Sequence, residues 1–252
     1  MSLDTPPRPD LPAASGDLLP PATWSWWEAI PVYLVAQLVA VAPLVIADAA
    51  GVIDLGGNRA PAFVLELFAG EIGFALAVVF WVRVVHSTPL AVLGLPRQPL
   101  RDVVTGFLAG IGLYVAGLVV GVVVALIAHA ILGHEPHLPD QVPGSVTGIW
   151  LALTGPAVIL AAPFGEELLF RGFLYRALRR RLGTWSAVAA SAAFFAMGHV
   201  QGWSFFYLVP PLFTVGAGLA IVYERRNSLL ASMTAHGTFN LIGFIFIASR
   251  HT

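Results

Sequence analysis

The chain has 252 residues, of which 58% are hydrophobic and 11% are charged, whereas soluble domains carry nearer a quarter of charged residues. One core of this size cannot bury so much apolar surface, so the composition excludes a soluble enzyme and a disordered chain. A formal net charge of −1 suggests no nucleic-acid partner. Cysteine is absent, which excludes disulfides, cysteine–metal sites and thiol catalysis.

The N-terminal segment differs from the rest. Residues 1–25 carry six prolines and no apolar run. A basic start and an apolar core, which mark a signal peptide, are both missing. We therefore expect a disordered, proline-rich cytoplasmic tail over residues 1–25.

Seven apolar runs follow the tail, and a helix needs roughly 20 residues to span about 30 Å of hydrocarbon. The predicted segments cover residues 26–47, 60–86, 101–132, 148–165, 185–200, 204–223 and 229–248. The fifth is short and the sixth contains Pro210-Pro211, so these two are candidates for a hairpin that does not fully cross the membrane. The predicted fold class is an all-α polytopic membrane bundle with about seven transmembrane segments.

The basic residues orient these segments. All 13 are arginines, and only Arg59 and Arg250 fall outside the tail and the loops after segments two, four and six. By the positive-inside rule the other eleven are cytoplasmic, which predicts a cytoplasmic N-terminus and an external C-terminus. Arginine without lysine, together with many alanines, is typical of a GC-rich bacterial genome, so a bacterial plasma membrane is the expected location.

Two further patterns concern packing. Residues 170–182 place apolar side chains on one helical face and most of their arginines on the other, which predicts a separate interfacial helix on the cytoplasmic leaflet. In segment three, the pairs Gly106/Gly110 and Gly117/Gly121 fit the small-xxx-small pattern of close helix contact. We expect internal packing there rather than a dimer interface.

Ionisable groups are costly inside a membrane, and a first cluster lies at the end of segment four. It reads Glu166-Glu167-Leu168-Leu169-Phe170-Arg171. Glu167 and Arg171 stand at i,i+4 with the acid first, the favourable order for an ion pair on a helix. Glu166 then projects about 100° away and keeps a free carboxylate. The structural alternative is a helix end that carries ordinary charges.

Two more clusters lie in later segments. His199 ends the run Phe195-Ala196-Met197-Gly198-His199, where a structural histidine is the alternative. His236 and Asn240 share one face of segment seven at i,i+4, where interhelical hydrogen bonding is the alternative. Together the three clusters supply a carboxylate, two imidazoles and an amide on three helices. These groups suffice to activate water and to stabilise an oxyanion.

The double glutamate with arginine, the Phe-x-x-x-His and the His-x-x-x-Asn, in this order, resemble the CPBP family. This family comprises CAAX prenyl proteases of type 2 and bacteriocin-processing or Abi-like membrane proteins, and the resemblance covers about residues 150–248. It implies an intramembrane endopeptidase. By match to the motifs, Glu166 and His199 would activate water, and His236 and Asn240 would hold the oxyanion. Glu167 and Arg171 would support the site.

The resemblance leaves the cofactor open, because both a metalloprotease and a purely glutamate-based mechanism are argued for the family. Glu166, His199 and His236 would make a three-ligand zinc site with an open position, although the HExxH helix of zincins is absent. The sequence His134-Glu135-Pro136-His137 has the wrong spacing and contains a proline. The expected partners are the lipid bilayer and a membrane-associated protein or peptide substrate, whose identity the sequence does not give; it also leaves the oligomeric state open.

The expected organisation is N-terminal transmembrane helices over residues 26–147 and a catalytic helical core over 148–252. One conflict arises: a straight segment from residue 184 puts His199 about 20 Å deep, whereas Glu166 should lie near the cytoplasmic end. For the two to meet, segment five must tilt or belong to the short hairpin, or Glu166 must lie deeper.

Two acids of segment two, Glu66 and Glu71, have no assigned role. For Glu71 we expect a structural hydrogen bond, with cavity lining as the alternative. Two other function classes also stay open, namely a non-catalytic scaffold of the same family and a small proton-coupled transporter.

Overall fold

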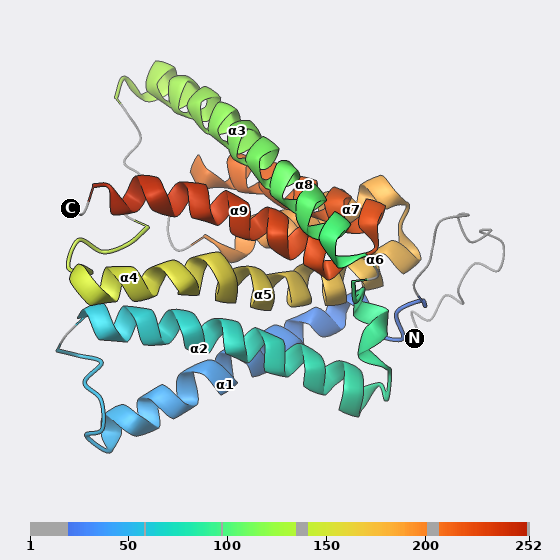
Figure 1. Ribbon diagram of the computed structural model, residues 1–252, viewed down its shortest axis with the longest axis horizontal. Helices are drawn as coiled ribbons and strands as arrows, with labels where there is room; N and C mark the ends of the chain where they lie inside the picture. Colours follow the sequence, from blue (N-terminus) through green and yellow to red (C-terminus); the bar gives the residue numbers. More distant parts are fainter. Residues whose placement is uncertain (1–19, 58, 97, 135–140, 201–206, 251–252) are drawn as a thin grey trace.

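The computed structural model describes residues 20–57, 59–96, 98–134, 141–200 and 207–250. Within these ranges the elements are helices joined by turns, with no strand, so the predicted all-α fold is confirmed. Figure 1 shows the helices as an elongated bundle, with the first and the last described residues at opposite ends.

Five helical stretches of the described chain are long and apolar enough to cross a membrane: Trp26–Ala49, Arg59–Val85, Pro99–Leu132, Gly148–Arg181 and Leu229–Ala248. They contain α1 (Ala29–Ala49), α2 (Arg59–Phe80), α3 (Pro99–Leu132), α4 (Gly148–Pro156), α5 (Ala162–Glu167), α6 (Arg176–Arg181) and α9 (Leu229–Ala248). Short 3-10 helices cover Trp26–Glu28 (η1) and Leu90–Leu93 (η3). All five stretches overlap segments predicted from hydropathy.

The two remaining predicted segments form α7 (Thr184–Gly198) and α8 (Val209–Arg226). With 15 residues, α7 is only about 22 Å long and does not span the hydrocarbon core. The two helices leave from and return to the same end of the bundle, as expected for a short hairpin (Figure 1). Pro210 and Pro211 lie in the first turn of α8, where a missing backbone N–H breaks no helical hydrogen bond.

The separate interfacial helix predicted for residues 170–182 is wrong. One continuous helical rod of 34 residues covers Gly148–Arg181, and within it π-helical turns (η4, Ala157–Ala161, and η5, Leu168–Tyr175) link α4, α5 and α6. Every residue of η5 is buried. The arginine pattern was misleading because Arg171, expected at the lipid head groups, is fully buried and paired with Glu167.

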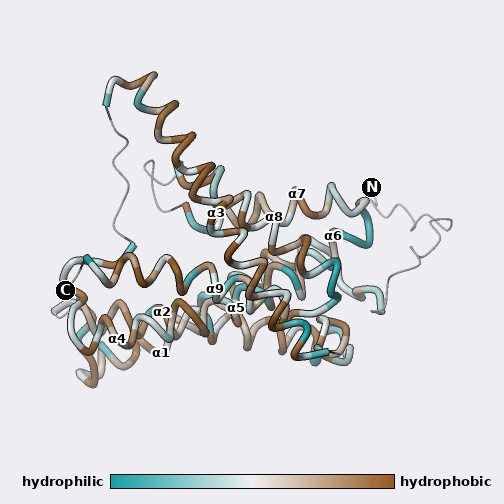
Figure 2. The backbone as a smooth tube through the Cα atoms, turned by 45° about the horizontal axis from the view of Figure 1, so that its top comes forward, coloured by the Kyte–Doolittle hydropathy of each residue, from teal (hydrophilic) through white to brown (hydrophobic). Residues whose placement is uncertain are grey.

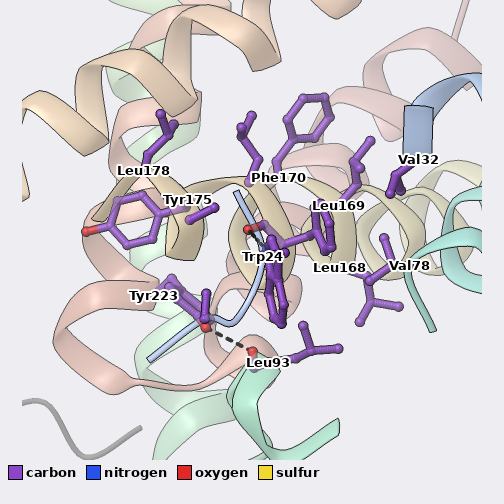
Figure 3. Packing of buried hydrophobic residues seen from close by; sticks show 14 of the residues in the cluster. Trp24, Val32, Val78, Leu93, Leu168, Leu169, Phe170, Tyr175, Leu178 and Tyr223 are labelled. Carbon is purple, nitrogen blue, oxygen red and sulfur yellow. Dashed lines mark hydrogen bonds between the residues drawn. The ribbon is translucent and has the colours of Figure 1, made fainter. Parts of the chain in front are cut away.

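The largest hydrophobic cluster surrounds this rod, and Figure 3 shows its side chains closing around Leu168, Leu169 and Phe170. Trp24, from the segment before α1, is fully buried there. Its ring stacks on Phe173 at 4.8 Å between centroids, and its indole Nε1–H donates to the Phe173 carbonyl at 2.9 Å.

The expected disordered tail is therefore too long at its C-terminal end. Residues 20–25 are held against the protein, because Trp24 is buried and Arg180 donates a hydrogen bond to the Ala22 carbonyl at 2.8 Å. Residues 1–19 lie outside the described residues.

Glycines set the position of α3 against α9. A Cβ atom on Gly106 would come within 2.5 Å of the Ala231 carbonyl oxygen, and one on Gly110 equally close to that of Ala235. This confirms close internal packing for the first glycine pair. A Cβ atom on Gly121 would meet nothing within 4 Å. Beyond this contact α3 diverges from the bundle, and Figure 2 shows its hydrophobic surface.

The described arginines are distributed unevenly between the two ends of the bundle. Arg59 and Arg250 belong to the end where α2 begins and α9 finishes (Figure 1). The helix termini at the other end carry Arg83, Arg101, Arg176, Arg179, Arg180, Arg181, Arg225 and Arg226.

Candidate active site

A helical hairpin brings the first two motifs together. Arg181 ends α6 and Thr184 begins α7, so the turn is short. Glu166 lies 15 residues before Arg181, and His199 lies 15 residues after Thr184. Because both legs rise about 1.5 Å per residue, the two residues reach the same depth. His199 Nε2 lies 3.8 Å from Glu166 Oε1.

The depth conflict seen in the sequence is resolved by the position of Glu166. Its segment does not end at residue 165 but continues to Arg181, which places Glu166 near the middle of the rod, about 22 Å from the turn. Hydropathy placed the segment end too early, because the charges of Glu167 and Arg171 neutralise each other inside the protein.

The third motif reaches the same carboxylate from α9. A Cβ atom on Gly237 would lie 2.8 Å from the Ile159 carbonyl oxygen, so this glycine lets α9 approach the backbone of η4 closely. The neighbouring His236 then lies with Nε2 4.0 Å from Glu166 Oε2. The Glu166 carboxylate thus stands between two imidazole rings.

Hydrogen bonds orient both rings. His199 Nδ1 lies 2.8 Å from the Phe195 carbonyl oxygen, which can only accept, so Nδ1 carries the proton. His236 Nδ1 lies 3.0 Å from Glu167 Oε1 and donates to that carboxylate. In each ring the Nε2 atom is the one that faces Glu166. A partner on the far nitrogen fixes the tautomer, as in other sites that use histidine.

The two adjacent glutamates have different surroundings, as their spacing to Arg171 predicts. Glu167 and Arg171 are fully buried and paired at 2.7 Å. Arg171 also donates to the Gly216 carbonyl at 2.9 Å, and its guanidinium lies 4.7 Å from the centre of the Phe195 ring. The Glu166 side chain is 13% exposed and that of His199 is 35% exposed. Glu167 therefore holds the helices together, while Glu166 faces a site that is open beside His199.

Asn240 is not among the groups that contact Glu166 in the described structure. Its Nδ2 atom donates to the Val158 carbonyl at 2.7 Å. Val158 belongs to the π-helical turn η4, and π-helical turns are frequent at functional sites. Asn240 thus ties α9 to the rod one turn beyond His236, with one of its two amide N–H groups.

The predicted metal ligands suit zinc in kind but not in spacing. Ligand atoms around a tetrahedral zinc with bonds of about 2.0 Å lie roughly 3.3 Å apart, whereas Glu166 is 3.8 Å from one Nε2 and 4.0 Å from the other. Among the described residues no three His, Asp or Glu side chains form a group that could hold a metal ion. Of the rejected His134–His137 segment, residues 135–137 lie outside the described residues.

One acid that the sequence left without a role lies beside the site. Glu71 of α2 contacts the backbone at Gly165, directly before Glu166. Sequence spacing gave no signal for it, because it is isolated from the three motifs. The expected structural hydrogen bond of its Oε2 atom is not found in the described part of the chain.

Comparison with known proteins assigns the half of the chain that carries this geometry. Residues 148–242 match the family described as type II CAAX prenyl endopeptidase Rce1-like. The chain carries a CPBP-family region. This region begins at the first residue of α4 and includes all three motifs. The matched family is a protease family, and the chain's apolar helices make it an integral membrane protein.

A more distant similarity extends over a longer stretch. The chain is 29% identical over 137 residues to the UPF0177 protein YbdI of Lactococcus lactis subsp. lactis (strain IL1403). This stretch is 51% of the present chain and 72% of the Lactococcus protein. No solved structure gives a significant match. The CPBP-family region therefore rests on sequence, and the geometry of its site rests on the structure described above.

Proposed function

We propose that the chain is an intramembrane endopeptidase that cleaves a peptide bond of a membrane-associated protein or peptide near the cytoplasmic side. The observation that carries the proposal is the convergence of Glu166 with the Nε2 atoms of His199 and His236, at 3.8 and 4.0 Å, inside a region that matches a protease family. A carboxylate between two oriented imidazoles is suited to general base catalysis on water.

In this mechanism Glu166 is the general base. Its carboxylate accepts a proton from water while the water oxygen forms a bond to the carbonyl carbon of the substrate. His199, which keeps its Nδ1 proton on the Phe195 carbonyl, offers the lone pair of Nε2 as a second acceptor for the same water. Collapse of the tetrahedral intermediate breaks the C–N bond, and Glu166 returns the proton to the leaving amine.

His236 has the opposite task. Its Nδ1–H donates to Glu167, a fully buried carboxylate, which stabilises the charged form of the ring. A charged His236 donates an Nε2–H to the oxyanion that develops on the substrate. The same assignment balances charge, because Glu166 and Glu167 then offset Arg171 and His236. Balance matters in this interior, since an uncompensated buried charge is expensive.

Asn240 has a supporting role in the proposal. One amide N–H is bound to the Val158 carbonyl, and the second remains available as a donor one turn from His236. We assign it to the edge of the oxyanion site. No step is derived through a metal, and addition of 1,10-phenanthroline is therefore expected to leave cleavage intact.

The orientation of the bundle is part of the proposal. The end that carries most of the described arginines is taken as cytoplasmic, in a bacterial plasma membrane. Ser145, exposed in the arginine-free loop before α4, then faces outside. A Ser145→Cys variant of this cysteine-free chain is expected to react with a membrane-impermeant thiol reagent in intact cells. Labelling only after permeabilisation would reverse the orientation.

The decisive experiment compares the membrane proteomes of cells that express the wild type and Glu166→Gln. The substitution keeps the shape of the side chain and removes the base, so uncleaved precursors are expected to accumulate at normal protein levels. A scaffold would keep its phenotype in this variant, and a proton-coupled transporter would lose flux without any change in peptide products. Equal precursor levels in the two strains would overturn the proposal.

A further inference from the structure

Glu71 lies outside the CPBP-family region, yet it touches the site. It belongs to α2, and a Cβ atom on Gly165 would lie 2.5 Å from Glu71 Oε2 and 2.6 Å from the Glu71 carbonyl oxygen. The two helices therefore meet backbone to backbone, directly before Glu166. The charges of Glu71 and Glu166 also act on each other. The absence of a side chain at residue 165 is what allows Glu71 to come this close.

The structural explanation does not account for Glu71. Its Oε2 atom is buried and has no hydrogen-bond partner in the described residues, and the same holds for Glu166 Oε2. An unsatisfied buried polar group costs about 1–3 kcal/mol. A purely structural glutamate would be expected to bind a neighbour in the way that Glu167 binds Arg171. Glu71 instead places an unused acceptor beside the proposed base.

The neighbours of Glu71 on α2 have different surroundings. Glu66 is exposed on the same helix, and the adjacent Ile72 is 53% exposed on the outer surface. Glu71 is the acid of this helix that faces the rod, so its position beside Gly165 follows from the packing of α2. These two neighbours provide matched controls.

We propose that Glu71 is a positioning residue of the active site, whose carboxyl group binds the attacking water together with Glu166. The proposal rests on the proposed protease function. Water has two hydrogens: Glu166 accepts the one that is transferred, and Glu71 fixes the other while the oxygen bonds to the substrate carbonyl carbon. Glu71 neither gains nor loses a proton in this step. The N-terminal helices then contribute to catalysis directly.

The first test uses the precursor identified by the Glu166→Gln comparison, as a purified substrate. Glu71→Leu is expected to lower kcat roughly tenfold or more, because the water loses its orientation, with KM within about twofold and an unchanged or higher Tm. Glu71→Gln should restore most of kcat, since an amide still binds water, and Glu66→Leu should match the wild type. Wild-type kcat in Glu71→Leu, or a loss that follows a fall in Tm, would overturn the proposal.

The second test does not depend on cleavage. Because the chain has no cysteine, Glu71→Cys and Ile72→Cys can each be exposed to a charged methanethiosulfonate reagent in detergent and in liposomes. The variant at residue 71 should react and that at residue 72 should not, because thiols react through their ionised form and need water. No reaction at residue 71, while Glu166→Gln still abolishes cleavage, refutes the role of Glu71 alone. Reaction at residue 71 with full activity in Glu166→Gln refutes the protease proposal instead.

Discussion

The N-terminal helices, up to Leu132, and the C-terminal region from Gly148 use their apolar residues in different ways. In the N-terminal region, α3 exposes most of its aliphatic side chains, among them Leu108, Val119 and Leu126. In the C-terminal region, eight successive residues of η5 are buried and the fully buried Glu167 and Arg171 lie beside them. Similar hydropathy therefore serves lipid contact in one region and a protein interior in the other. The difference shows that polar residues, rather than apolar ones, carry the information about packing in such a chain.

The two regions are joined at a few defined points. Trp24 binds the Phe173 carbonyl of η5, and Glu71 touches Gly165. Gly106 and Gly110 receive the backbone of α9. Changes at these points test how far the N-terminal region supports the site, whereas changes within η5 and α9 test the site itself.

The largest effect on stability is expected within the C-terminal region. Arg171→Ala leaves Glu167 buried without its ion pair, which typically costs 3–5 kcal/mol. We expect a large fall in the yield of folded protein and in Tm after extraction in mild detergent. The double variant Glu167→Gln/Arg171→Met removes both charges and should recover part of the Tm. If Arg171→Ala alone melts at the wild-type temperature, the ion pair does not stabilise the fold.

A large effect on turnover, without loss of stability, is expected at His199. Its ring is partly exposed and makes one hydrogen bond, to the Phe195 carbonyl, so His199→Gln should fold normally. Removing a group that assists proton transfer lowers the rate by roughly 10²–10⁴. Cleavage of the purified precursor measures this, with His129→Gln, near the far end of α3, as the control. Cleavage by His199→Gln within a factor of two of the wild type contradicts the role of this ring.

Much of the fold could be predicted from the sequence, because the bilayer fixes the length of apolar segments. All seven predicted segments correspond to helices, and the Glu167–Arg171 pair follows from helical spacing alone. The level of Glu166 with His199 was also available, since each lies 15 residues from the ends of the turn between α6 and α7. That register required knowing that the fourth helix continues to Arg181.

The remaining features depend on contacts that leave no periodic signal. Arg171 faces inward because Glu167 neutralises it, whereas its spacing alone favoured a surface. Trp24 is held by a ring and a carbonyl from a segment about 150 residues later in the chain, and its proline-rich surroundings suggested disorder. Glu71 has no partner at helical spacing, so its place beside Gly165 appears only when α2 and α5 are packed.

A smaller effect is expected where α3 meets α9. In Gly110→Ala the added methyl group would lie 2.5 Å from the Ala235 carbonyl oxygen, so the helices must separate. Overpacking of this kind costs typically 1–3 kcal/mol, which a thermal melt in detergent detects. Gly121→Ala on the same helix meets nothing within 4 Å and should keep the wild-type Tm. Equal melting of the two variants would show that α3 is not fixed by this contact.

The smallest effect is expected at the link formed by Trp24. Trp24→Phe keeps an aromatic ring that can stack on Phe173 and removes only the indole N–H that binds the Phe173 carbonyl. The net value of one such bond is about 1 kcal/mol, so we expect a small fall in Tm. Trp27→Phe provides the matched control, because Trp27 is 55% exposed and its replacement should leave Tm unchanged. Phe173 lies two residues after Arg171, on the rod that also carries Glu166, so kcat on the purified precursor should be measured alongside. A fall in kcat with Tm nearly constant would mean that the N-terminal segment positions the catalytic rod, whereas a fall in Tm alone would limit its role to stability.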